Sequence, residues 1–158
     1  MGKQVCANDT LHFPSVLTAA TVANSATQLS AEDVDFLLST KAKRSQDEFI
    51  QKTFEGIFYT QTELAFLDNL WAGIRELKSP FKRAMALAAI LRSAIKRQPR
   101  GLFTVSDPSA YQDGRRDLLL TLKQHFIEQV EIYNSAVFSN GKRNAVTCGD
   151  VYDVKPGS

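Results

Sequence analysis

The chain has 158 residues, 44% of them hydrophobic and 23% charged, which is an ordinary globular composition and not a disordered one. Its net charge of +2 favours neither nucleic acid nor any other partner by itself. The longest apolar run, residues 84–91, is far shorter than the roughly 20 residues that span a bilayer, so no membrane segment is predicted.

Two cysteines and two histidines, none of them at ligand spacing, predict no metal site. The N-terminus carries no basic segment followed by an apolar one, so we predict no secretory signal. The cysteines are therefore expected to be reduced thiols, and the protein is expected to be cytoplasmic.

In chain order, residues 3–9 predict a short buried strand that ends in polar side chains. Pro14 suits the first turn of a helix, because proline lacks the N–H that this position leaves unpaired anyway. Ser30 is placed to cap a second short helix, and Asp47 a third.

Further along the chain, Thr60 and Glu63 form the capping-box pattern that starts a helix, and apolar residues follow at spacings of three and four. Pro80 opens the next helix. Residues 116–138 predict one long helix, and residues 144–150 predict a second short strand.

Basic residues are concentrated in one stretch, residues 77–106, which contains no Asp or Glu, while the rest of the chain carries a net charge of −5. This asymmetry favours an anionic partner, and a solvated basic surface is the alternative. On a helical wheel, Lys82, Arg83, Lys96 and Arg97 share one side with Arg92 at its margin. Small residues lie between these charges, namely Ala86, Ala89 and Ser93. We therefore predict an open basic face that a phosphate backbone can approach closely.

Both predicted strands end in an acid, Asp9 and Asp150. In doubly wound sheets, ligands bind at the carboxyl ends of the strands, so two such carboxylates would face one ligand. Each acid by itself is also an ordinary turn residue at a strand end. The eight glycines are scattered and no G-x-G-x-x-G phosphate loop occurs.

The order and spacing of several segments resemble the middle of the Dam-like adenine-specific DNA methyltransferases. Residues 2–9 resemble the second strand of these enzymes, and Gly149-Asp150 with the following residues resembles the third-strand motif. The other similar segments lie between the strands, at residues 59–70, 100–104, 113–118, 125–126, 133–134 and 138–141.

The resemblance implies a mainly helical single domain over residues 1–158, in which residues 1–13 and 142–154 are strand stubs and residues 14–141 form a helical region. The strands would be parallel neighbours in part of a methyltransferase α/β fold. The resemblance further implies that Asp9 holds the ribose hydroxyls of S-adenosylmethionine, that Asp150 holds its adenine amino group, and that the helical region recognises the DNA target.

The Phe-x-Gly-x-Gly and Asp-Pro-Pro-Tyr motifs of that family do not occur in the sequence. We therefore expect no catalytic residue in this chain, no strong cofactor binding and no methyl transfer by the chain alone. The leading interpretation is a DNA-binding target-recognition segment that uses Lys82, Arg83, Arg92, Lys96, Arg97, Arg115 and Arg116. Lys82, Arg83, Lys96 and Arg97 are expected to dominate.

Two alternatives stay open. The chain could be a free-standing helical interaction protein of mobile-element origin that acts by oligomerising, or it could complement a separate chain that supplies the missing motifs. Because the two strands would have bare edges, a homodimer is also predicted, with Val5, Ala7, Val146 and Val151 in its interface.

Overall fold

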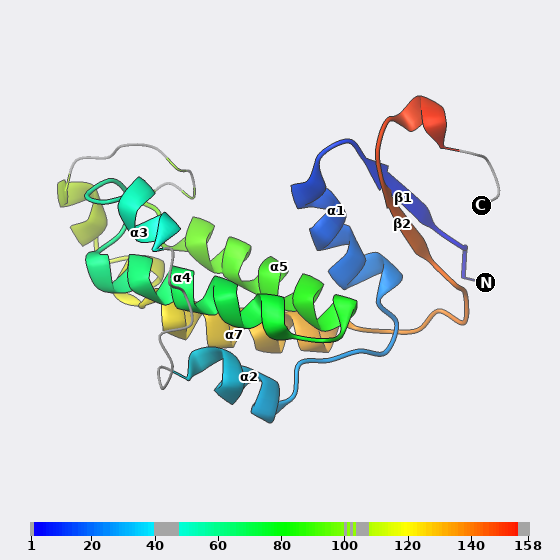
Figure 1. Cartoon of the computed structure of the whole chain (residues 1–158), viewed down its shortest axis with the longest axis horizontal. Coiled ribbons are helices and arrows are strands. Elements are labelled where there is room, and N and C mark those ends of the chain that lie inside the picture. Colours follow the sequence, from blue (N-terminus) through cyan, green and yellow to red (C-terminus); the bar gives the residue numbers. More distant parts are fainter. Residues whose placement is uncertain (1, 40–47, 100, 102, 104–107, 155–158) are drawn as a thin grey trace.

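The computed structural model describes residues 2–39, 48–99, 101, 103 and 108–154. A body of helices lies at one end of the molecule, and a small pair of strands with helix α1 (His12–Thr18) lies at the other (Figure 1). The two ends of the chain are both at the strand end. The helix cap predicted at Asp47 lies outside the described residues.

Strands β1 (Cys6–Asp9) and β2 (Ala145–Cys148) pair in parallel, with Cys6 opposite Ala145 and Asp9 opposite Cys148. The Asp9 carbonyl also accepts a hydrogen bond from the Gly149 N–H at 3.0 Å. Parallel neighbours need a long crossover connection, and the whole helical region provides it here. The predicted fold class, mainly helical with a two-strand parallel element, is therefore confirmed.

Helix α1 begins at His12, before Pro14, and continues into a π-helical turn, Ala19–Ala23. Helix α2 (Ala31–Leu38) has the predicted cap, because the Ser30 hydroxyl accepts from the Asp33 N–H at 3.3 Å. Helix α3 (Phe49–Thr53) is capped by a side chain from helix α4 (Gln61–Glu76), and not by a residue next to it in the sequence. The buried Asp68 carboxylate accepts from the N–H groups of Ile50 and Gln51, each at 3.0 Å.

Helix α4 (Gln61–Glu76) starts at the predicted capping box, in which the Thr60 hydroxyl accepts from the Glu63 N–H and the Glu63 carboxylate accepts from the Thr60 N–H. Helix α5 (Pro80–Lys96) opens on Pro80, also as predicted. A short 3₁₀ turn, Pro108–Gln112, precedes the next helices, and another, Val151–Asp153, follows β2.

The single long helix predicted for residues 116–138 is wrong. The structure has α6 (Arg116–Leu119) and α7 (Leu122–Ala136), separated at Leu120, whose backbone is extended. Thr121 and Gln124 form a capping box at this point, which ends one helix and starts the other. Leu119, expected in the buried stripe of one continuous helix, is therefore 71% exposed.

Helix α5 is the centre of the helical body, where it packs mainly against α7 and also against α4, α1 and the π-helical turn. Because neighbours cover it on several sides, the small residues predicted on an open basic face are fully buried: Ala86, Ala89 and Ser93 are each 0% exposed. The prediction of an open face is wrong, since these side chains are small to let other helices approach and not a phosphate backbone.

Candidate nucleic-acid interface

Four of the predicted DNA-binding residues line one hollow of about 540 Å³. Arg92 and Lys96 come from α5, and Arg115 and Arg116 come from the start of α6. Gly101 and Asp117 are also in the lining. The hollow therefore joins two basic segments that lie apart in the sequence, which makes it the strongest anion-binding candidate among the described residues.

Three of these cations form ion pairs with carboxylates, of which only Asp117 lines the hollow. The Lys96 Nζ lies 3.2 Å from the Asp117 carboxylate. Arg115 donates from Nε to Asp113 at 2.6 Å and from Nη2 to the Pro99 carbonyl. Arg116 forms a two-bond ion pair with Glu128 of α7 (bonds from Nη1 and Nη2).

The pair between Arg116 and Glu128 favours the charged form of both side chains. The hydrogen bond from Arg116 lowers the pKa of Glu128, and the same bond raises the pKa of Arg116. The Arg115 backbone N–H, followed by its side chain, lowers the pKa of Asp113. Arg92 is exposed and makes no ion pair within the described parts of the chain, so the hollow keeps an uncompensated positive charge.

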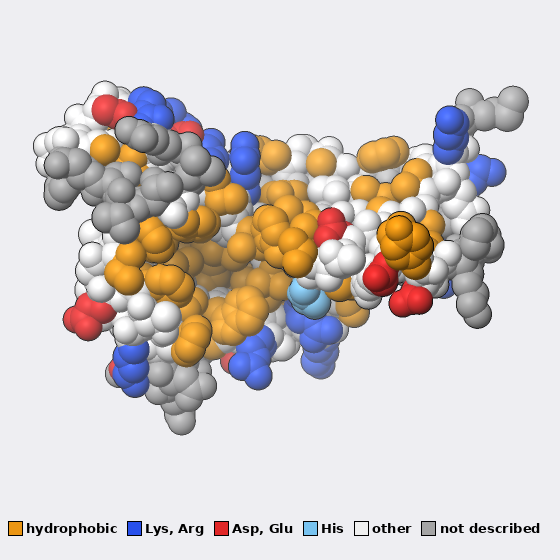
Figure 2. Space-filling view, turned by 90° about the horizontal axis from the view of Figure 1, so that it is seen from above, with side chains coloured by type: hydrophobic (Ala, Val, Ile, Leu, Met, Phe, Trp, Pro, Cys, Tyr) orange, Lys and Arg blue, Asp and Glu red, His pale blue; other side chains and the backbone are white. Residues whose placement is uncertain are grey.

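The other three predicted residues lie elsewhere. Lys82 pairs with Asp33 of α2, and Arg97 pairs with Glu63 of α4. Arg83 lines a separate hollow that His12 and Cys148 share. In the view of Figure 2, Lys and Arg side chains lie in separate groups around the margin, while hydrophobic side chains occupy the hollowed middle. The residues of the predicted single basic face therefore lie in four separate places.

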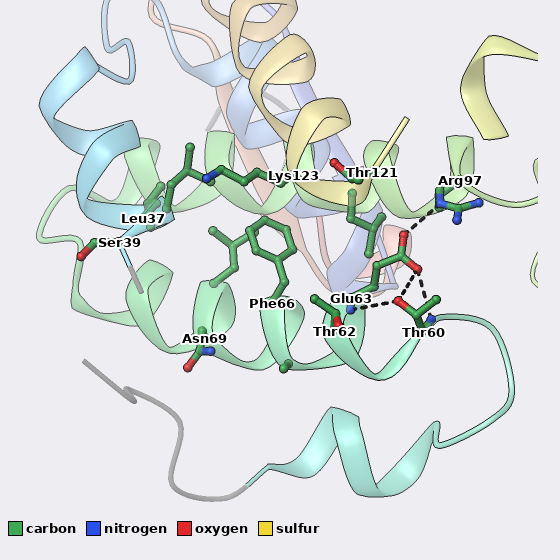
Figure 3. A pocket seen from close by; sticks show the side chains of 14 residues that line it. Leu37, Ser39, Thr60, Thr62, Glu63, Phe66, Asn69, Arg97, Thr121 and Lys123 are labelled. Carbon is green, nitrogen blue, oxygen red and sulfur yellow. Dashed lines mark hydrogen bonds and ion pairs between the residues drawn. The ribbon is translucent and has the colours of Figure 1, made fainter. Parts of the chain in front are cut away.

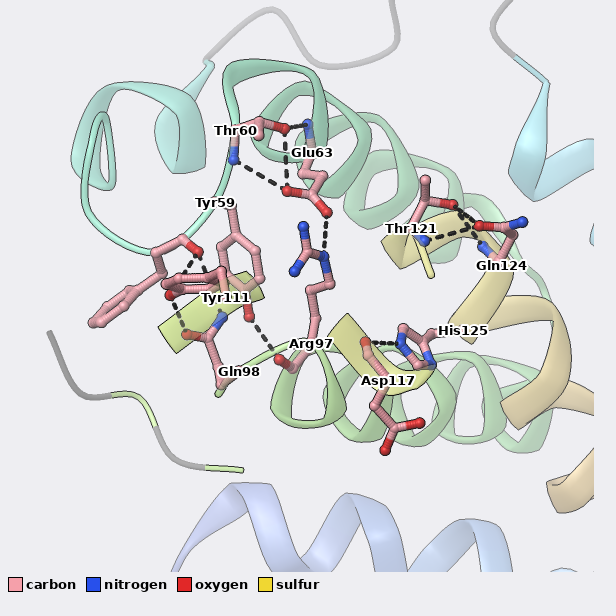
Figure 4. Close-up of polar contacts among 12 residues, drawn as sticks. Tyr59, Thr60, Glu63, Arg97, Gln98, Tyr111, Asp117, Thr121, Gln124 and His125 are labelled. Carbon is pink, nitrogen blue, oxygen red and sulfur yellow. Dashed lines mark hydrogen bonds and ion pairs between the residues drawn. The ribbon is translucent and has the colours of Figure 1, made fainter. Parts of the chain in front are cut away.

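Arg97 belongs to a buried polar network that the sequence did not reveal (Figure 4). Its Nε donates to Glu63 at 2.9 Å, and its guanidinium lies 5.9 Å from the centre of the Tyr111 ring. The Tyr111 hydroxyl donates to the Gln98 side chain at 3.0 Å. The only available signal was the capping box, because Glu63 uses one carboxylate oxygen to cap α4 and keeps the other for Arg97.

Tyr59 closes this network from the other side of the end of α5. Its hydroxyl donates to the Ala94 carbonyl at 2.9 Å, and burial raises the pKa of this hydroxyl well above its ordinary value. Tyr59 therefore stays protonated and acts as a hydrogen-bond donor to the backbone. The arrangement fixes the end of α5 and with it the position of Lys96 in the basic hollow.

Asp9 ends β1 and Asp150 follows the end of β2 by two residues, so both acids lie at the carboxyl end of the parallel pair. The Asp9 carboxylate accepts from the Leu11 N–H at 2.8 Å, and the Asp150 carboxylate accepts from the Tyr152 N–H at 3.0 Å. In each acid the described hydrogen bond uses Oδ1, so Oδ2 is available for another donor.

Within the described residues, no three His, Cys, Asp or Glu side chains gather in a cluster that could hold a metal ion. Both cysteines, Cys6 and Cys148, are exposed thiols. None of the described helices is long and apolar enough to cross a membrane.

Comparison with known proteins identifies a protein of similar sequence. The chain is 32% identical over 165 aligned residues to Type II methyltransferase M2.HphI of Haemophilus parahaemolyticus. This chain is similar to a methyltransferase. The alignment includes 97% of the chain and 48% of the relative, so the chain spans about half the length of the protein that it matches. No known protein family profile and no solved structure matches.

The similarity supports a methyltransferase relationship for nearly the whole chain, as the resemblance predicted. The mostly helical structure with its parallel strand pair agrees with part of a methyltransferase-like fold. Neither the comparison nor the fold supports the alternative of a free-standing interaction protein of mobile-element origin.

Proposed function

We propose that the chain is the DNA-binding target-recognition segment of an adenine-specific DNA methyltransferase. The observation that carries the proposal is the hollow that gathers Arg92, Lys96, Arg115 and Arg116 from two elements. The similarity to a type II methyltransferase over nearly the whole chain supports the enzyme class. Within this proposal, residues 1–158 form one domain, with strand stubs at residues 1–13 and 142–154 around the helical region 14–141.

The chemistry of the hollow suits a phosphate backbone. Arginine forms planar, paired hydrogen bonds with phosphate oxygens, and three arginines face the hollow with one lysine. Arg115 and Arg116 are more than half exposed even in their ion pairs, at 55% and 65% of the side chain. A phosphate can therefore replace Asp113 or Glu128 as their partner without disturbing the core.

Lys82, Arg83 and Arg97 stay predictions as DNA contacts. Lys82 and Arg97 are largely shielded by their carboxylate partners, with side-chain exposures of 30% and 17%. Arg83 is exposed and remains the best placed of the three to meet DNA. The proposal thus moves the main contact surface from the predicted helix face to the hollow.

We also propose that Asp9 and Asp150 contact S-adenosylmethionine. Carboxylates accept hydrogen bonds, and the two donors that the resemblance assigns, a ribose hydroxyl and an adenine amino group, match them. Two observations support this fit: both acids lie at the carboxyl end of the strand pair, and the Oδ2 of each acid is available. The cofactor would supply the methyl group, while these residues would only bind and orient it. Strong binding and methyl transfer by the 158-residue chain alone are not expected, because its sequence contains neither Phe-x-Gly-x-Gly nor Asp-Pro-Pro-Tyr.

A protein partner is proposed for the strand edges. Within the described residues the sheet has two strands, so each keeps one edge unpaired, and Val5 and Val151 are 40% and 62% exposed. A second copy that pairs there, with Ala7 and Val146 in the interface, would give a homodimer. A chain that supplies the missing motifs is the alternative partner at these strand edges.

Light scattering over a range of micromolar concentrations tests the homodimer, and a constant monomeric mass would reject it. A cytoplasmic location, as predicted from the sequence, accords with the proposed activity.

The salt dependence of duplex binding tests the DNA proposal. Non-specific binding is expected at about 10⁻⁴–10⁻⁶ M in physiological salt. Replacing Arg92, Lys96, Arg115 and Arg116 by Gln should flatten the plot of log affinity against log salt by roughly three to four units, at about 0.9 per phosphate.

The matched control carries the same loss of charge elsewhere. It replaces four exposed cations on other elements by Gln: Lys3, Lys78, Lys142 and Arg143. Its slope should stay close to that of the unchanged chain. Equal slopes for the two quadruple variants would reject the hollow as the DNA-binding surface.

A further inference from the structure

A second, larger cavity lies on another side of the helical body. It has a volume of about 620 Å³ and lies where α2, α4 and α7 meet. Its apolar lining includes Leu37, Ala65, Phe66, Leu70 and Leu122. Cavities of about 300–1,000 Å³ with mainly apolar walls and a few polar groups are typical of small-molecule sites.

One end of this cavity is lined by a fixed polar pair. Glu63 and Arg97 lie together at that end, opposite Leu37 and Ser39 (Figure 3). The pair is held by the Arg97–Glu63 bond at 2.9 Å and by the bonds from Thr60 to the other Glu63 oxygen. The charges of Glu63 and Arg97 offset each other, so this end is polar but has no net charge.

One further charged side chain gives the cavity lining its net charge. Lys123, on the first turn of α7, is exposed and makes no ion pair with any described residue. Its side chain extends along the cavity toward Leu37 (Figure 3). The lining therefore combines apolar walls with one uncompensated cation, a complement to an apolar molecule that carries one negative charge.

We propose that this cavity binds a small amphipathic anion: a chain-like or aromatic apolar body with one carboxylate or sulfonate. The apolar body contacts Phe66, Leu70 and Leu122, and the anionic group meets the Lys123 ammonium. A small molecule fits the cavity, because its volume of about 620 Å³ lies within the range of small-molecule sites. The proposal is independent of the DNA-binding role of the other hollow.

The test uses decanoate as the probe, with decanol as its uncharged counterpart, and measures both by calorimetry on the 158-residue chain. Decanoate is expected to bind one per chain and about tenfold more tightly than decanol, since a charged hydrogen bond is lost with the alcohol. Lys123→Glu should remove this preference. Lys142→Glu, which reverses an exposed charge beyond the end of α7, should leave it unchanged.

A second variant tests the volume of the cavity. Ala65→Trp fills the space beside Phe66 and should abolish decanoate binding while the circular dichroism spectrum stays that of the unchanged chain. The proposal is overturned if decanoate and decanol bind equally, if neither binds, or if binding survives both Lys123→Glu and Ala65→Trp. Binding of an acidic amphipathic peptide without any binding of decanoate would also overturn it, in favour of a protein ligand. If Ala65→Trp does not fold, the Lys123→Glu comparison decides alone.

Discussion

Lys96 and Arg97 are neighbours in the sequence but have opposite surroundings at the end of α5. Lys96 faces the basic hollow, where its partner Asp117 is 43% exposed. Arg97 faces the helical body, where its partner Glu63 is 11% exposed and also caps α4. A run of basic residues is thus not one surface. The partner of each cation decides whether it is available to a ligand or is part of the framework.

The largest effect on stability is expected for a charge placed at a buried position of α5. Ala89→Lys places an ammonium at a position that is 0% exposed, and burying a charge without a partner should lower the free energy of unfolding by about 4 kcal/mol or more. Urea unfolding measures the loss. Arg92→Lys, one turn along at an exposed position, is the control and should leave the midpoint unchanged. An Ala89→Lys variant as stable as this control would restore the open basic face.

The next effect separates the two arginine ion pairs. Glu63→Ala leaves the Arg97 guanidinium largely buried without its acid and removes half of the α4 capping box, which should cost about 3 kcal/mol of unfolding free energy. Glu128→Ala, which removes the partly exposed acid beside Arg116, should leave the urea midpoint unchanged. Similar losses in the two variants would show that the Glu63–Arg97 pair is not part of the framework.

A smaller effect depends on pH and concerns Lys82 and its acid. Burial opposes ionisation of Asp33, but hydrogen bonds from Lys82 and Ser30 outweigh it and lower the pKa below the ordinary value of 3.8. An acid whose pKa is lowered by folding stabilises the protein above its unfolded pKa and loses this contribution as the pH falls through the folded pKa. The stability difference between the unchanged chain and Asp33→Asn should therefore be constant near neutral pH and shrink below about pH 4. Asp35→Asn, which removes an exposed acid of the same helix, is the control for the change in net charge.

The smallest effect sharpens the description of the hollow. Glu128→Gln frees Arg116 from its carboxylate without changing the shape of the side chain. If phosphate competes with Glu128 for Arg116, the slope of log affinity against log salt should steepen by about 0.9 while the urea midpoint stays the same. Glu131→Gln, at an exposed acid of α7, is the control for the change in net charge. Equal slopes in the two variants would mean that Arg116 does not contact DNA.

Much of the fold could be predicted because its signals are local. Ser30, Thr60 and Pro80 mark helix starts within a few residues, and each of these starts is confirmed. Thr121 carries the same kind of signal, but the apolar spacing across residues 116–138 concealed it. The parallel pairing of the strands followed from the resemblance and not from any local pattern.

The candidate site could be predicted only in part. The basic residues were identified, but their partners could not be, since Asp33, Glu63 and Asp117 come from elements far from them in the sequence. The absence of acids from residues 77–106 therefore did not mean an absence of acids around α5. Helical periodicity also assumes one buried side, and α5 has neighbours on several sides, so a wheel could not separate its buried from its exposed positions.

The register of the strand pair has a consequence for how such proteins can evolve. The chain leaves β1 at Asp9 and enters β2 at Ala145, which lies opposite Cys6, so the helical body is attached to the strand pair at its two opposite ends. Any helical insert whose ends span the length of one strand can replace it without rebuilding the strands. Exchange of such inserts offers a route by which one sheet acquires new binding specificities.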